Sequence, residues 1–571
     1  METYLSRSRP LAGDLIKPLF AGVFLLMALA LPACSKAASP AEIAAGKAVF
    51  AANCALCHDA SPTMGDFQGP PLFGVAGRKI GGAAGFDYSD ALKAAHGRGE
   101  TWNESNLDAF LADPQQAMPG TQMPVNVPNA TDRHNLIAYL TSLNGKTAAA
   151  TKAAEPASGP MSGQDNLDWR KDAPGVRHRV TVADLPKPFA TNSAGNSAKY
   201  VTPADDFMPK APAGFNVSLF SKDVNGPRNM RTAPNGDLYV VESGEGRISI
   251  FRNQGGKLGT TRQTFAEGQK DGMNQPFGVA FQGAYVYIAN VDSVVRIPVS
   301  GGKPETVVAN LSTTGGHSTR DIAFSADGKF MYISVGSGSN VAEDIGQPPA
   351  GFVAGHALGE SWGSEAGRAL VLRFKPDGSD RHVFATGIRN CVGLAFKPGT
   401  NDLYCSTNER DMLGDNLVPD YFTRIADGQF FGWPWYYLGD HEDPRQTGVR
   451  PDLKGKVSLP DTLFVSHSAP LGFTFYQAPA GAASAFPSQY DGEAFIALHG
   501  SWNRAARTGS KIVIAHIKDG KPTGEYEDFL TGFILDDKRV SARPVGVAVG
   551  PEGALYVSDD AGNRIWRVAP E

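Results

Sequence analysis

The chain has 571 residues, of which 19% are charged and 42% are hydrophobic, and its formal net charge is −5. This length predicts at least two domains, and the acidic balance argues against a general nucleic-acid-binding protein. The contents of Gly (65) and Pro (40) are high, which suits a protein rich in turns and β-strands.

The N-terminus reads as an export signal. Basic residues precede an apolar run that is too short to span a membrane comfortably, and this run ends in "LPAC" at Cys34. The pattern resembles a lipoprotein signal over residues 1–33, after which Cys34 becomes the acylated first residue. Plain secretion with cleavage nearby is the alternative. Either reading predicts a mature protein outside the cytoplasm, and we expect a periplasmic protein anchored to the membrane through Cys34.

The next motif is "CALCH", which holds Cys54, Cys57 and, directly after them, His58. Two thiols at this spacing can add to the two vinyl groups of one porphyrin, and the following histidine can bind the iron. A helical pattern leads into the motif, and a last helical pattern, "RHNLIAYLTSL", closes the segment.

Residues 40–145 resemble class I cytochrome c in the order of these motifs. The resemblance implies a small all-α domain with covalent haem c and places the sixth iron ligand in "PGTQM" at Met123, with Met118 as a nearby rival. A thioether opposite a histidine suits electron transfer. Four further positions match residues that pack on the haem in the family: Pro70, Arg78, Tyr88 and Trp102.

Residues 146–165 are rich in Ala, Pro and Ser and predict a flexible linker. The stretch 166–213 is mixed, and we expect it to wrap the domain that follows. Cys391 and Cys405 lie further along the chain. They could form a disulfide in an oxidising compartment, but both occupy apolar strand positions, so we expect two separate buried thiols.

Six similar segments follow, each with an alternating apolar strand, a turn containing Gly and a second strand with Tyr or Phe. Repeated sheets of about four strands without intervening helices predict propeller blades. Residues 166–571 are therefore expected to form an all-β, six-bladed β-propeller after the helical domain. The segment "FNVSLF" at 215–220 is free to pair with the last blade and close the ring.

The first strand of each blade lines the central channel of such a propeller, so residues just before it surround one mouth. Alignment of the six copies puts a histidine, four arginines and an asparagine there: His317, Arg228, Arg320, Arg389, Arg543 and Asn390. Four arginines around one cavity suit an anion with several carboxylates or phosphates. A structural ion pair is the alternative for each arginine taken singly.

His317 is the candidate for acid–base chemistry. Neighbouring positive charges lower the pKa of an imidazole, and a neutral imidazole is a good general base near pH 7. The alternative is a structural histidine held by hydrogen bonds.

The second domain resembles the soluble PQQ-dependent glucose/sorbosone dehydrogenase family through "GGHSTR", "GIRNCVGLAF", "STNERDMLGDNLVPDYFTRIADGQFFGWP", "ALHGSWNR" and "SARPVGVAV". These motifs look closer to its sorbosone and pyranose branch. The resemblance implies PQQ bound with Ca²⁺, and makes His317 the base that takes the hydroxyl proton of a sugar. It assigns PQQ contacts to Arg389, Asn390, Arg504 and Arg543, and calcium ligands to backbone carbonyls near Glu409 and Arg410.

Two positions depart from the glucose branch: Ser541 stands where that branch has an arginine, and Ser337 stands where it has an aspartate that supports the base. The combined expectation is a quinohaemoprotein that oxidises a sugar, sugar aldehyde or polyol and passes electrons through haem c to an external carrier, such as another cytochrome or the respiratory chain. The alternatives are a calcium-dependent propeller lactonase fused to a cytochrome and a non-catalytic electron-transfer module.

Overall fold

The computed structural model describes residues 38–55, 58, 60, 69–83, 86, 88–123, 125–143, 168–204, 206–313, 315–342 and 345–571. The predicted signal peptide with Cys34, the predicted linker 146–165 and Cys57 lie outside the described residues. Among the helices that are described, none combines the length and the hydrophobicity needed to cross a bilayer.

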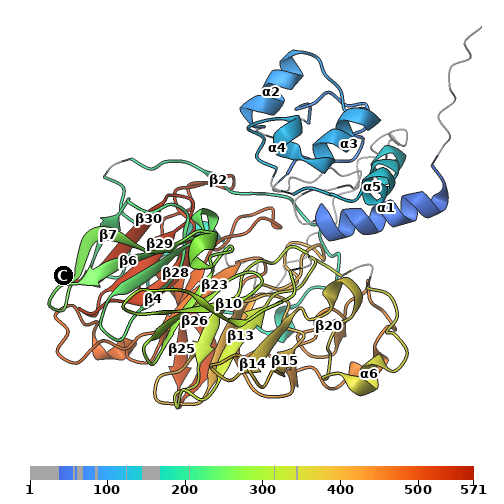
Figure 1. Cartoon of the computed structure of the whole chain (residues 1–571). Helices are drawn as coiled ribbons and strands as arrows, with labels where there is room; N and C mark the ends of the chain where they lie inside the picture. Colours follow the sequence, from blue (N-terminus) through green and yellow to red (C-terminus); the bar gives the residue numbers. More distant parts are fainter. Residues whose placement is uncertain are drawn as a thin grey trace, which may run out of the picture. The chain divides into compact units, whose positions relative to one another are not determined.

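The N-terminal domain is built from helices, as predicted (Figure 1). They are α1 (Pro40–Asn53), α2 (Asp90–Gly97), α3 (Glu104–Ala112), α4 (Pro114–Ala117) and α5 (Ala130–Ser142). Asn129 begins α5, because its side chain accepts hydrogen bonds from the backbone N–H groups of Thr131 and Asp132 at 2.8 and 3.1 Å. An asparagine capping box likewise begins α3.

Helices α1 and α5 pack closely against each other. A Cβ atom added to Gly46 would lie 1.9 Å from the backbone oxygen of Asn135, so no larger residue fits at this crossing. Phe50 and Tyr139 pack beside it with ring centroids 5.5 Å apart. The helix that leads into the "CALCH" motif is thereby fixed against the last helix of the domain.

In the described part of the second domain, six sheets of four or five strands form the propeller blades, which confirms the predicted fold. Blade 1 contains β4 (Pro227–Thr232), β5 (Leu238–Glu242), β6 (Arg247–Asn253) and β7 (Leu258–Glu267). Blade 2 contains β8 (Gly278–Gln282), β9 (Tyr285–Ala289), β10 (Val294–Pro298) and β11 (Glu305–Val308). Blade 3 contains β12 (Ile322–Phe324), β13 (Met331–Val335), β14 (Leu370–Phe374), β15 (His382–Thr386) and the parallel edge strand β19 (Gln429–Phe430).

The other three blades follow the same antiparallel order. Blade 4 contains β16 (Cys391–Phe396), β17 (Leu403–Thr407), β18 (Tyr421–Ile425) and β22 (Thr462–Leu463). Blade 5 contains β23 (Pro470–Phe475), β24 (Ala494–Leu498), β25 (Lys511–Lys518), β26 (Lys521–Leu530) and the added strand β1 (Arg177–Arg179). Blade 6 contains β28 (Pro544–Val549), β29 (Leu555–Asp559), β30 (Arg564–Pro570) and β3 (Phe215–Ser221). Short elements between them are β2 (Lys199–Tyr200) paired with β27 (Arg539–Val540), β20 (Tyr436–Tyr437) paired with β21 (His441–Glu442), and α6 (Phe352–Gly355).

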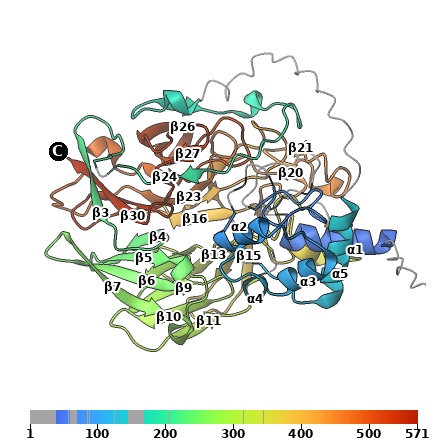
Figure 2. The same cartoon turned by 90° about the horizontal axis from the view of Figure 1, so that it is seen from above.

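The first strands of the blades contact one another in a closed circuit: β4, β8, β12, β16, β23, β28 and again β4. The ring closes through β3, which pairs with β30 in the last blade as predicted for "FNVSLF". Figure 2 shows β3 beside β30 and the sheets following one another around the domain. The starts of the first strands therefore surround one end of the channel, which is the geometry that the alignment of the blades assumed.

The stretch predicted to wrap the propeller does so in part, because β1 extends blade 5 along β26. A buried cluster fastens it: Lys511 Nζ lies 2.8 Å from carboxylate oxygens of both Asp172 and Asp528. His178 lies 2.8 Å from the same Asp528 carboxylate. The Asp and His side chains are close enough to hold a metal ion, but the Lys511 ammonium group already supplies the balancing positive charge, so we infer a structural cluster.

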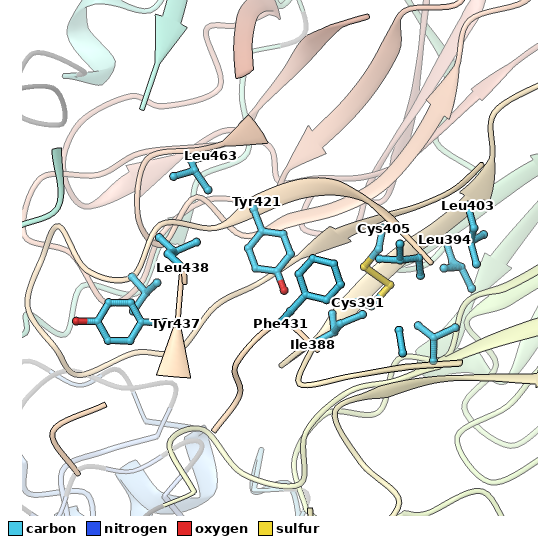
Figure 3. Close-up of a cluster of buried hydrophobic side chains, with 14 of the residues drawn as sticks. Ile388, Cys391, Leu394, Leu403, Cys405, Tyr421, Phe431, Tyr437, Leu438 and Leu463 are labelled. Carbon is cyan, nitrogen blue, oxygen red and sulfur yellow. A yellow bond between two sulfur atoms is a disulfide. The ribbon is translucent and has the colours of Figure 1, made fainter. Parts of the chain in front are cut away.

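The expectation of two separate thiols is wrong, because Cys391 and Cys405 form a disulfide between β16 and β17 (Figure 3). An irregularity in the strand pairing between Cys391 and Gly393 shifts the register, and the two Cα atoms come to 5.7 Å, within the usual disulfide range. Tyr421 and Phe431 pack in the same buried cluster. Hydrophobic position alone did not reveal the bond, since it depends on which residues face each other across two strands.

Replacing both cysteines by alanine is expected to lower the free energy of unfolding of the propeller by about 3 kcal/mol, because the bridge closes a short loop of the unfolded chain. Urea unfolding under oxidising conditions measures the effect as a lower midpoint. A reducing agent should move the wild-type midpoint toward that of the variant and leave the variant unchanged. Equal midpoints for the two oxidised proteins would show that the bridge adds no stability.

Candidate functional site

The helical domain encloses a largely apolar cavity of about 270 Å³. Cys54, His58 and Met123 all line it, whereas Met118 packs against the core of the domain and is not among the lining residues. This placement favours Met123 over Met118 as the ligand opposite His58. The predicted packing residues also line the cavity: Pro70, Arg78, Tyr88 and Trp102.

His58 is oriented for metal binding. Its Nδ1 lies 2.8 Å from the carbonyl oxygen of Pro70, and because a carbonyl can only accept, Nδ1 carries the proton and Nε2 keeps its lone pair. Burial lowers the pKa of His58, which maintains the neutral form that binds iron. A Cβ atom on Gly69 would lie 2.2 Å from His58 Cε1, so glycine is required beside the ring. The apolar lining with a nitrogen and a sulfur ligand fits a haem.

In the propeller, one position of the blade alignment can be checked directly, because four of its six residues are apolar and the other two are Arg228 and Arg320. Phe277, Val392, Leu471 and Val545, from four different blades, form one buried cluster. We call this cluster the channel plug. Residues directly before it on each first strand therefore surround a single mouth.

His317 lies at this mouth and is half-buried. Its Nδ1 is 3.0 Å from the carbonyl oxygen and 2.9 Å from the hydroxyl oxygen of Ser337. The carbonyl can only accept, so Nδ1 carries the proton and Nε2 is the basic nitrogen. Burial, together with the charges of Arg389, Arg368 and Arg320, holds the pKa of His317 well below its usual value, so the ring is neutral at pH 7.

Asn390 and Arg389 lie beside His317. A Cβ atom on Gly336 would lie 2.3 Å from Asn390 Oδ1 and 2.8 Å from His317 Cβ, so only a glycine lets these two residues come so close. The guanidinium group of Arg389 donates to the backbone oxygens of Asn340 and Asn408 at 3.0 and 3.2 Å. Its Nη2 donates to the side chain of Asn340 and lies 3.6 Å from a carboxylate oxygen of Asp411. The guanidinium group is therefore fixed next to the histidine.

Arg228 and Arg543 form a second group with His499 and Asp560. Asp560 accepts hydrogen bonds from Arg228 and from His499 Nε2, the latter at 2.9 Å. Arg228 also lies over the ring of Phe277 in the channel plug, 5.5 Å from its centroid. Arg543 donates from Nε to the His499 carbonyl at 3.4 Å, and within the described chain its two terminal nitrogens have no hydrogen-bond partner. These two terminal N–H groups of Arg543 can donate together to one carboxylate.

The structure does not bring Arg320 and Arg504 to the mouth as available donors. The terminal nitrogens of Arg320 donate to backbone oxygens of its own loop: Ser312, His317 and Thr319. Arg504 donates to Asp415 and Asn416 instead. Both geometries favour a structural role, through these neutral oxygens rather than through the ion pair weighed above for single arginines.

Glu409 and Arg410 are buried and paired with each other at 2.9 Å. Arg410 also donates to the backbone oxygens of Pro434 and Tyr436. One carboxylate oxygen of Glu409, Oε1, is buried with no hydrogen-bond partner among the described residues. The side chains thus brace this loop, and calcium binding by its backbone carbonyls stays a prediction.

The residues that follow the second strand of each blade were not predicted from the sequence. Strands β13, β17, β24 and β29 end directly before positions near the mouth, which hold Gly336, Asn408, His499 and Asp560. Applying the same blade alignment to the second strands would have found them. Glu365 and Arg368, which contact the loops around His317, lie in an insertion between β13 and β14, and the blade alignment offered no signal for them.

The family model for TrAA12-like proteins matches residues 209–420 and 452–571, which is more than half of the chain. The chain belongs to the TrAA12-like family. A cytochrome c model matches residues 43–144 of this TrAA12-like protein. Cytochrome c2 from Rhodoblastus acidophilus is 45% identical over 97 residues, which are 17% of the chain and 87% of that protein. The N-terminal domain is therefore a cytochrome c domain, as its motifs indicated.

Other similarities extend over the TrAA12-like domain. An uncharacterised protein from Borreliella burgdorferi is 28% identical over 384 residues, 63% of this chain and 90% of its own. The holo form of the pyranose dehydrogenase PQQ domain from Coprinopsis cinerea is 19% identical with a TM-score of 0.50, covering 64% of this chain and 98% of that one. The calcium structure of a Trichoderma reesei family AA12 protein is 19% identical with a TM-score of 0.50, covering 66% and 99%. These two structures show that the TrAA12-like domain shares their fold.

Proposed function

We propose that this protein oxidises a sugar, sugar aldehyde or polyol at the propeller mouth and passes the electrons through its cytochrome c domain to an external acceptor. The proposal rests on the state of the His317 ring. Nδ1–H donates to the Ser337 carbonyl, so Nε2 keeps its lone pair. The pairing of a TrAA12-like domain with a cytochrome c domain supports it. So does the likeness in fold to a pyranose dehydrogenase PQQ domain.

The donor set at the mouth fits PQQ, a tricarboxylate ortho-quinone. Arg228 lies over Phe277 of the channel plug, and the terminal nitrogens of Arg543 are available to a carboxylate. Arg389 adds positive charge beside His317, although its own nitrogens donate to Asn340 and Asn408. Carbonyls of the loop at Glu409 would hold Ca²⁺, which prefers oxygen ligands. Bound PQQ would supply a quinone that accepts hydride from the sugar carbon.

In the reaction, the chain's own residues transfer the proton and hold the reacting groups in place. His317 Nε2 takes the proton of the substrate hydroxyl as hydride leaves the same carbon, so the substrate loses two electrons and two hydrogens. Burial, and after it the charge of Arg389, lowers the pKa of His317 and so keeps the ring neutral beforehand. Haem would supply an iron that accepts the electrons singly, with His58 and Met123 as its ligands.

A calcium-dependent lactonase would need carboxylates at the mouth as metal ligands. Asp560, which does lie there, is already bound to Arg228 and His499. Asp411, beside Arg389, is likewise paired with Arg389 and His467. This observation favours the dehydrogenase. We also propose export to the periplasm with lipid attachment at Cys34, on the basis of the N-terminal sequence alone.

Reconstitution tests the proposal directly. The purified full chain, carrying haem but no PQQ, is mixed with PQQ and Ca²⁺ and then with a panel of aldoses, sugar aldehydes and polyols. At least one substrate is expected to reduce the haem, seen as growth of the reduced absorption band, and omission of PQQ should abolish the signal. Failure of every substrate would refute the proposal, and hydrolysis of a sugar lactone would then identify the lactonase.

A further inference from the structure

The imidazole of His317 is held by a serine turn and by two buried charged side chains that lie in the insertion between β13 and β14. We propose that Ser337, braced by Glu365 and Arg368, is the positioning residue that fixes His317 with Nε2 as its basic nitrogen. This inference rests on the proposed role of His317 as the base. Ser337, Glu365 and Arg368 would orient that base.

The directions of the hydrogen bonds around Ser337 fix the state of the ring. The Ser337 hydroxyl donates to the carbonyl oxygen of Ser339 at 2.6 Å, so the lone pairs of Ser337 Oγ are left to accept. His317 Nδ1 lies 2.9 Å from that oxygen and 3.0 Å from the Ser337 carbonyl. Both partners act as acceptors, which selects the neutral tautomer with its proton on Nδ1.

Glu365 braces the turn that carries Ser337. Its buried carboxylate accepts from the backbone N–H of Gly338 at 2.7 Å and from the hydroxyl of Ser339 at 2.5 Å. Ser339 Oγ in turn accepts from the backbone N–H of Ala342 at 2.9 Å. The two residues after Ser337 are thus tied to one carboxylate, so the carbonyl and hydroxyl of Ser337 keep their directions.

Arg368 joins this turn to the segment that carries the histidine. Its side chain donates to the backbone oxygens of Gly336 at 2.6 Å and Ser337 at 2.8 Å on one side, and to that of His317 at 2.6 Å on the other. The guanidinium is buried, and all of these acceptors are neutral carbonyls. The ring and its acceptor are therefore held by the same side chain.

A neutral partner has a chemical consequence that a carboxylate would not have. A carboxylate on Nδ1 stabilises the imidazolium and raises its pKa, whereas the Ser337 carbonyl is itself polarised by Arg368. Burial lowers the pKa of His317 most, the charges of Arg389, Arg368 and Arg320 lower it further, and the hydrogen bond to the Ser337 carbonyl opposes them by raising it. The Glu365 carboxylate is bound to the turn behind Ser337. The arrangement keeps Nε2 free to accept a proton at mildly acidic pH, where a histidine–aspartate pair would already be protonated.

The test uses the full haem-containing chain without substrate or PQQ. Histidine labelled with ¹³C and ¹⁵N is incorporated, the His317 signals are assigned by their loss in His317→Gln, and the ring is titrated by NMR. The wild-type ring is expected to stay neutral with its proton on Nδ1 below about pH 6.5, the usual pKa of histidine. Ser337→Asp should raise the midpoint of protonation by about one unit or more, whereas Ser488→Asp, on an exposed turn of blade 5, should not shift it.

Glu365→Gln keeps the size of the side chain but replaces one accepting oxygen by an NH2 group that can only donate, so one of the bonds to Gly338 and Ser339 is lost. We expect the His317 nitrogen shifts to move toward a mixture of tautomers. In the reconstituted enzyme, the acid limb of the pH profile of kcat/KM should move to higher pH in Ser337→Asp by the same amount as the NMR midpoint. An unshifted His317 titration in Ser337→Asp, or a wild-type ring protonated on Nε2, would overturn the positioning proposal. Those NMR results do not depend on turnover, so they are separable from failure of the dehydrogenase proposal.

Discussion

Replacement of His317 by alanine is expected to lower the turnover number by about 10²–10⁴-fold, because the substrate hydroxyl loses the base that takes its proton. Binding of PQQ should persist, since its expected contacts are the arginines and Asn390. The measurement is stopped-flow reduction of the haem band by substrate after reconstitution, together with fluorescence titration of PQQ binding. Near-normal turnover with bound PQQ would remove His317 from the role of base.

His382→Ala is the matched control for this experiment. His382 is half exposed and pairs with Asp427 at 2.6 Å on the outer part of blade 3, away from the channel plug. This variant should keep both turnover and PQQ binding. If it lost turnover to the same extent as His317→Ala, the effect would reflect damage to the blade rather than loss of a base.

Replacement of Met123 by alanine is expected to slow electron transfer to the haem while substrate oxidation in the propeller continues. The expected covalent attachment through Cys54 and Cys57 does not need the thioether, so haem should remain bound, but loss of the sulfur ligand lowers the reduction potential. Each drop of about 59 mV makes one-electron reduction of the haem tenfold less favourable. Substrate-driven haem reduction should fall sharply, while turnover with a small dye that accepts electrons directly from the propeller should continue.

Met118→Ala provides the control, because Met118 packs against the same core but does not line the cavity. Its potential and its rate of haem reduction should stay close to the wild-type values, and redox titration at the haem band measures both variants. A fall in potential in Met118→Ala but not in Met123→Ala would reverse the ligand assignment.

The sequence was most informative where repeats could be compared. Aligning six copies placed Phe277, Val392, Leu471 and Val545 at equivalent positions, and in the structure these four residues form the channel plug. The pairing of β3 with β30 also agrees with the sequence, in which "FNVSLF" lies before the first copy and is free to pair with the last blade. Periodicity is a property of the sequence, so it could be read without coordinates.

What the sequence could not provide was the direction of long side chains. Arg320 and Arg389 occupy mouth positions in the alignment, yet the first donates to carbonyls of its own loop and the second to Asn340 and Asn408. An arginine reaches several residues away from its Cα atom, so position alone does not decide its partner. The Cys391–Cys405 bond was missed for a related reason, since a single irregularity in strand pairing sets which side chains meet.

The pairing of β3 with β30 has a consequence for the order in which the protein matures. Strand β3 is made first among the strands of blade 6, and β30 is made last. The ring therefore cannot close until β30 has been synthesised, and such long-range pairing is slow. The described helices of the cytochrome c domain end at Ser142, so they can form while the propeller is still an open chain.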